Sequence, residues 1–227
     1  MQIGGQSLPA NLKLKILMIR QSAPYNKLFL FVIAGLEWFT LSSQFYLIIQ
    51  NRNASIVETV IRYFSFFTIL TNLAIALAAT FILLIPISRQ GKFFSKPSTL
   101  SAIAVYIIVV GIIYNTILRF QWQPKGWQLI IDELLHAVLP LLYTLFWIFF
   151  VPKNTLKWKD ILPWMIFPML YIVWTMMHGA FSGFYPYPFV DVGVLGYPKV
   201  ILNGVGMVAF FIVASCILIG IGKTRKN

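Results

Sequence analysis

Hydrophobic residues run through this chain in six long stretches that are separated by short polar segments. They lie near residues 28–50, 60–86, 98–118, 130–151, 161–181 and 199–222. A helix needs about 20 mostly apolar residues to cross the hydrocarbon core of a bilayer, and each stretch reaches that length. The pattern predicts an all-α, polytopic membrane bundle of six transmembrane helices, which forms a single domain over residues 1–227.

Composition agrees with a membrane protein, because 59% of the 227 residues are hydrophobic and only 11% are charged. A soluble domain with that much apolar surface would aggregate. Cys216 is the only cysteine and there are two histidines, so we expect no intrachain disulfide, no metal site and no cofactor.

The 18 basic residues give a net charge of +12, and their positions alternate from one connection to the next. Basic clusters precede the first apolar stretch and follow the second, fourth and sixth. The other connections hold only Arg52, Arg62, Arg119, Lys125 and Lys199. By the positive-inside rule both termini are cytoplasmic, including the segment 1–27, which lacks the features of a signal peptide. This distribution orients a protein in the cell membrane, so we expect contacts with membrane lipids and no nucleic-acid partner.

Two of the apolar stretches carry polar side chains at helical spacing. Ser65, Thr68 and Asn72 share one face of the second stretch, and Asp132 and His136 share one face of the fourth. Thr68 lies about 9 Å below Arg62 and His136 about 6 Å below Asp132, at 1.5 Å of rise per residue. The two side chains therefore reach similar depths in the outer half of the bundle.

A threonine hydroxyl opposite an imidazole suggests nucleophilic catalysis, because the hydroxyl needs a base and the base needs an orienting group. In this interpretation Thr68 is the nucleophile, His136 the base and Asp132 the orienting group. Cleavage of an ester also requires hydrogen-bond donors for an oxyanion, and Asn72, Asn115 and Arg119 are candidates. His178 is a weaker candidate base near the membrane surface. The structural alternative is a threonine bonded to its own helix and a histidine packed between helices.

Two further residues carry separate expectations. Glu37 lies about ten residues into the first stretch, where a carboxyl group should face the bundle. It would serve there either as a hydrogen-bond partner for another helix or as a proton carrier. Pro140 has no N–H, so we expect it to free a backbone carbonyl one turn earlier, near His136.

At these residues the chain resembles the androgen-induced protein family, in its bacterial six-helix integral membrane branch. The resemblance rests on Tyr-Phe-x-Phe-Phe-Thr-x-x-x-Asn-Leu at 63–73, Leu-His-x-Val-x-Pro-Leu at 135–141 and Tyr-Pro-Tyr-Pro-Phe at 185–189. It implies a multi-pass fold, and animal members are threonine hydrolases of fatty acid esters of hydroxy fatty acids. Carried over by motif, the catalytic pair would be Thr68 and His136, with Thr71 as the alternative position for the threonine.

Two functions from different classes follow from these observations. The first is a threonine-dependent hydrolase of long-chain lipid esters, acting in the outer half of the bundle. The second is a non-catalytic membrane protein that binds or transports a lipid or small amphiphile, and a proton-carrying Glu37 would favour it.

Overall fold

The fold is that of a computed structural model, which describes residues 25–224, and throughout that range the ordered elements are helical. Six helices there are long and apolar enough to cross a membrane, which confirms the six predicted spans. The predicted cytoplasmic segment 1–27 lies outside the described residues except for its last three.

The first span, α2, is a single helix from Lys27 to Gln50, with the Asn26 side chain accepting from the Phe29 N–H at its start. It packs beside α4 (Phe67–Leu84). The Trp38 indole donates to the Thr80 hydroxyl across this pair at 3.0 Å.

The second span differs from the prediction, because the expected helix over residues 60–86 is broken. A short helix, α3 (Ile56–Phe64), ends at Ser65, and α4 begins after Phe66, whose backbone is extended at φ −85° and ψ 124°. Two side chains of the fifth span, α9 (Ile161–Ser182), stabilise the break. The Tyr171 hydroxyl donates to the Ser65 carbonyl at 3.0 Å, and the Trp174 indole donates to the Ser65 hydroxyl at 3.0 Å. That carbonyl would otherwise extend the helix, so the break depends on contacts between residues far apart in the sequence.

The remaining spans also contain local departures from a straight helix. After α5 (Arg89–Phe94), the third span is α6 (Pro97–Thr116) with a 3₁₀ turn, η1 (Leu118–Phe120). The fourth is α7 (Trp127–Glu133), a π-helical segment, η2 (Leu134–Val138), and α8 (Leu139–Phe150). The fifth is η3 (Trp158–Asp160) and α9 (Ile161–Ser182). A loop containing η4 (Pro188–Val190) leads to α10 (Val192–Thr224), which is interrupted at Gly196.

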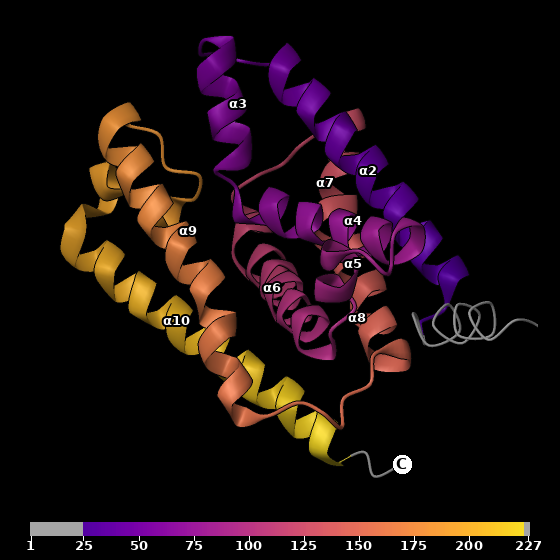
Figure 1. The fold of residues 1–227 in the computed structure, drawn as a ribbon. Coiled ribbons are helices and arrows are strands. Elements are labelled where there is room, and N and C mark those ends of the chain that lie inside the picture. Colours follow the sequence, from indigo (N-terminus) through magenta and orange to yellow (C-terminus); the bar gives the residue numbers. More distant parts are fainter. Residues whose placement is uncertain (1–24, 225–227) are drawn as a thin grey trace, which may run out of the picture.

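Figure 1 shows α4 and α6 at the centre of the bundle, with α2 and α8 on one side and the pair α9–α10 along the opposite flank. The centre is tightly filled: Ile75, Ala104 and Ile107 are fully buried, as is Phe146 of α8. Both described chain ends lie towards one end of the bundle, whereas α3 and the α9–α10 connection lie towards the other (Figure 1). An even number of long helices that run back and forth is consistent with this arrangement.

Candidate functional site

Two cavities meet inside the bundle, at the end that carries α3. One has a volume of about 420 Å³ and an almost wholly apolar lining from α6, α9 and α10; we call it the apolar chamber. The other has a volume of about 680 Å³ and is lined by both apolar and polar residues of α3, α7 and the adjoining connections; because it holds most of the polar groups, we call it the polar chamber. The residues that line both chambers are Thr68, Tyr114, Leu118, His136 and Tyr187.

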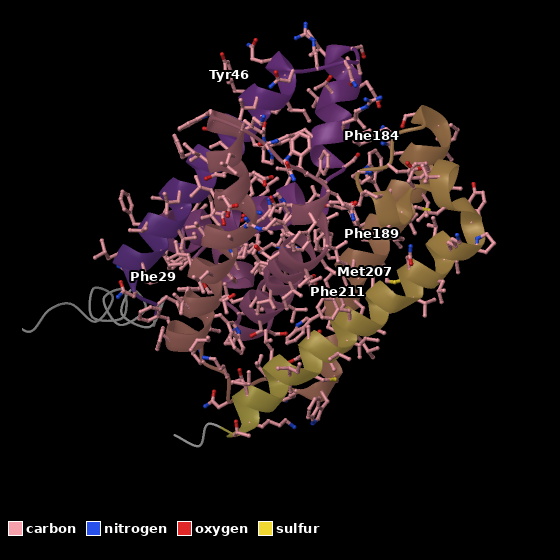
Figure 2. All side chains as sticks on the ribbon, turned by 180° about the vertical axis from the view of Figure 1, so that it is seen from behind. Phe29, Tyr46, Phe184, Phe189, Met207 and Phe211 are labelled. Atoms are coloured by element: carbon pink, nitrogen blue, oxygen red, sulfur yellow. The ribbon has the colours of Figure 1, made fainter. Side chains whose placement is uncertain are left out.

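The apolar chamber is suited to a hydrocarbon chain. Its wall includes Phe189, Met207 and Phe211, which Figure 2 shows between α10 and the central helices. The lining of the polar chamber also contains apolar residues, but adds charged and amide side chains such as Arg52, Gln121 and Gln128. A molecule with one apolar and one polar part would therefore place its junction beside the five shared residues.

Thr68 stands at the start of α4, and the break before that helix determines what its hydroxyl can contact. Some threonines of the bundle bond back to the carbonyl four residues earlier, as Thr80 does to Ala76 and Thr144 to Pro140, whereas Thr40, Thr71 and Thr175 have no hydrogen-bond partner within the described residues. Thr68 follows the break instead, and its Oγ1 lies 3.3 Å from the Tyr187 hydroxyl. The hydroxyl therefore faces the two chambers, where a substrate would have access to it.

His136 is held by its own helix through one ring nitrogen, and its other ring nitrogen is unengaged within the described residues. Its Nδ1 lies 2.9 Å from the Asp132 carbonyl oxygen and 3.3 Å from the Asp132 carboxylate. A proton on Nδ1 satisfies both acceptors, which leaves Nε2 as the basic nitrogen; within the described residues Nε2 has no hydrogen-bond partner. The predicted role of Asp132 as orienting group fits this geometry.

Tyr114 completes the support of the histidine and was not anticipated from the sequence. Its ring stacks on the His136 ring with centroids 4.0 Å apart and an interplanar angle of 13°, and its hydroxyl donates to the Asp132 carboxylate. It occupies an apolar helix one position before Asn115, so only the polar neighbour stood out in the sequence. Its part in the site depends on how α6 meets the fourth span.

Asn115 lies beside the π-helical segment and lines neither chamber. Pro140 cannot donate to the His136 carbonyl, and the Asn115 side chain donates to that carbonyl instead at 3.1 Å, which confirms the carbonyl expected from the sequence. The Asn115 amide also donates to Gly111, and its oxygen accepts from Arg119. Asn115 thus fixes the backbone of the histidine rather than facing a substrate.

The other two candidate oxyanion donors are also engaged elsewhere. Asn72 is fully buried and donates to the Thr68 carbonyl at 2.8 Å, and Arg119 makes a two-pronged ion pair with Glu133 at 2.5 and 2.8 Å. Neither lines a chamber. A hydroxyl that the sequence did not suggest, that of Tyr187, lies 3.3 Å from Thr68 Oγ1.

His178 belongs to a polar cluster between α3 and α9 that borders the polar chamber through Arg62. Its Nε2 lies 3.4 Å from the Glu58 carboxylate, which also pairs with Arg62 at 2.7 Å. The hydrogen bond from Arg62 is the main cause that lowers the pKa of Glu58, so this carboxylate is ionised at neutral pH. His178 lines neither chamber and joins two helices at the rim of the bundle.

Thr71 and Glu37 lie away from both chambers. Thr71, the alternative nucleophile, is fully buried three residues beyond Thr68. Glu37 is fully buried in α2, and neither of its carboxyl oxygens has a hydrogen-bond partner within residues 25–224. Over the same range, no three His, Cys, Asp or Glu side chains gather as a metal site would require.

Comparison with known proteins gives no independent identification. No protein-family model, no curated protein sequence and no solved structure matches this chain.

Proposed function

We propose that this chain is an integral membrane hydrolase of long-chain fatty acid esters, with Thr68 as nucleophile and His136 as base. The observation that carries the proposal is the junction of the two chambers. A threonine hydroxyl free of the backbone and an imidazole oriented through Nδ1 both line that junction. The resemblance to the androgen-induced protein family supports the same pair, and the geometry does not depend on it.

The reaction divides into two acyl transfers. His136 Nε2 takes the proton of the Thr68 hydroxyl as Oγ1 attacks the ester carbon, and a tetrahedral intermediate forms. The ester C–O bond then breaks, the leaving alcohol takes the proton from Nε2, and the acyl group stays on Thr68. A water molecule next attacks the acyl-threonine with Nε2 again as base, which releases the fatty acid and restores the hydroxyl.

Within the described residues no direct hydrogen bond joins Thr68 to His136, because the threonine hydroxyl contacts Tyr187 instead. Catalytic contacts are often loose without substrate and tighten in the reacting complex. In the proposed complex the acyl chain fills the apolar chamber and the alcohol part lies in the polar chamber. Water reaches the ester through the polar chamber, at the outer face of the cell membrane.

The first prediction concerns the catalytic pair. Purified Thr68→Ala, His136→Ala and the double variant should all lose hydrolysis of para-nitrophenyl palmitate to a similar degree, because nucleophile and base act as a unit. Thr68→Ser should keep part of the activity, since it retains the hydroxyl. A fluorophosphonate probe should label the wild-type protein and leave Thr68→Ala unlabelled.

Thr71→Ala is the matched control, because it removes the same group three residues from Thr68 at a position that lines neither chamber. It should retain activity and labelling, with thermal melts confirming that all variants are folded. If Thr68→Ala hydrolyses the ester like the wild type, the catalytic proposal fails. The two chambers would then support the alternative function, a protein that binds or transports a lipid without cleaving it.

A further inference from the structure

The Tyr187 hydroxyl contacts the proposed nucleophile at two atoms. It lies 3.3 Å from the Thr68 backbone nitrogen, whose N–H donates to it, and 3.3 Å from Thr68 Oγ1. Tyr187 also lines both chambers, from the loop between α9 and α10. Tyr187 is therefore a side chain outside the predicted catalytic set whose hydroxyl contacts the hydroxyl of the proposed nucleophile.

The position of this hydroxyl follows from the start of α4. The first N–H groups of a helix have no partner within the helix, and here Phe66 provides no side-chain cap. The first intrahelical bond at this end runs from the Leu70 N–H to the Phe66 carbonyl. The Tyr187 oxygen thus accepts from a donor that would otherwise be unpaired, at the end of the helix that favours negative charge.

Its surroundings hold Tyr187 in place. Pro186 and Pro188 flank it in the chain and restrict the backbone on both sides. Its ring stacks on Phe189 with centroids 5.3 Å apart and an interplanar angle of 3°, and it meets Phe66 edge to face at 5.9 Å. A donor fixed before the reaction stabilises developing charge without reorganisation.

We propose that Tyr187 is a third catalytic residue, whose phenol O–H donates to the oxyanion of the tetrahedral intermediates on Thr68. The inference rests on the proposed function. When the ester carbonyl enters, its oxygen lies between the phenol and the Thr68 N–H, and the two groups donate to it together. The phenol keeps its proton throughout: the carbonyl π-bond electrons form the oxyanion, and they return when the C–O bond breaks.

The protonation state of the phenol agrees with this role. Burial raises the pKa of Tyr187, although its bond with Thr68 acts in the opposite direction. The phenol therefore remains a donor at neutral pH.

The test uses Tyr187→Phe in the full-length protein, with Tyr185→Phe as the matched control. Tyr185 belongs to the same loop, but its ring packs on Gly179 and lines neither chamber. With para-nitrophenyl palmitate, Tyr187→Phe should lower kcat by about 10²- to 10³-fold and change KM little, since one oxyanion donor is lost. Tyr185→Phe should stay within a few-fold of the wild type.

Inhibition by two ligands distinguishes an oxyanion donor from a residue that only caps the start of α4. A long-chain alkyl boronic acid imitates the tetrahedral intermediate on Thr68, whereas the corresponding alkyl ether imitates the bound substrate. Tyr187→Phe should weaken inhibition by the boronic acid about 10²-fold and leave that by the ether unchanged. Equal losses with both ligands, or a kcat like that of Tyr185→Phe, would overturn the inference while Thr68→Ala remained inactive. An active Thr68→Ala would overturn the proposed function and this inference together.

Discussion

At the scale of single residues, the His136 imidazole is the group in the site that is held by contacts from several neighbours. Asp132 engages Nδ1 through both its carbonyl and its carboxylate, and the Tyr114 ring covers one face. Tyr114 in turn donates to the Asp132 carboxylate. Because the three side chains depend on one another, the orientation of the imidazole should be sensitive to each partner.

We expect Asp132→Asn to lower kcat by about 10²-fold or more, because the amide no longer stabilises the imidazolium or favours the required tautomer. Tyr114→Phe should have a smaller effect in the same direction, since it removes one bond to the carboxylate and keeps the stacked ring. Steady-state hydrolysis of para-nitrophenyl palmitate measures both. Glu133→Gln is the control, because this neighbouring carboxylate pairs with Arg119 and lines neither chamber. An Asp132→Asn variant as active as Glu133→Gln would exclude the orienting role.

The residues that the sequence could identify were those whose chemistry is unusual in a membrane helix. Thr68, Asp132 and His136 stand out as polar groups among apolar ones, and the structure brings all three to the polar chamber. Neither Tyr114 nor Tyr187 could be assigned to the site, even though Tyr187 belongs to the 185–189 motif, because aromatic residues are common in membrane helices and at their ends. Their positions come from contacts across 18 and 119 residues of sequence, which no local pattern encodes.

At the scale of helices, both halves of the proposed site lie where regular α-helix stops. The break at Ser65–Phe66 places Thr68 at the start of a helix, and the π-helical segment Leu134–Val138 carries His136. The sequence indicated the second irregularity through Pro140, but it gave no sign of the first. Ser65 and Phe66 are ordinary helix residues, and the break is held by Tyr171 and Trp174 from a distant span.

Gly111 allows α6 to approach the π-helical segment closely. A Cβ at this position would lie 3.2 Å from the Pro140 Cβ and 3.7 Å from the His136 carbonyl oxygen. Gly111→Leu should therefore push the histidine backbone away from α6 and cost about 1–3 kcal/mol of stability through overpacking. We expect a lower melting temperature in detergent and a reduced kcat.

Gly35→Leu serves as the control for that change. Gly35 lies within a membrane helix as well, but a Cβ there would meet no atom of residues 25–224 within 4 Å. Both substitutions gain the same helix propensity, so the difference between them isolates the contact with the fourth span. Equal behaviour of the two variants would show that the close approach at Gly111 is not needed.

At the scale of the whole molecule, the number of spans was predictable and the chambers were not. The length of a span depends on the thickness of the bilayer. The positions and lengths of the apolar stretches were therefore enough to predict all six spans. The chambers depend on how α9 and α10 sit against α6, and lipid and protein interior are equally apolar. The exposed apolar side chains of α10, such as Ile201 and Val205, therefore look like its buried residues in the sequence.

The orientation of the bundle is the last prediction, and it decides which side of the membrane supplies water to the site. Basic residues concentrate in the connections at 89–96 and 153–159, so we expect these connections in the cytoplasm and the polar chamber at the outer face. With Cys216 replaced by Ala, single cysteines at Lys92 and Lys157 should resist a membrane-impermeant maleimide in intact cells and react after permeabilisation. A cysteine at Lys125, on an exposed part of the opposite connection, should react in intact cells. Labelling of Lys92→Cys or Lys157→Cys from outside would invert the topology and place the polar chamber at the cytoplasmic face.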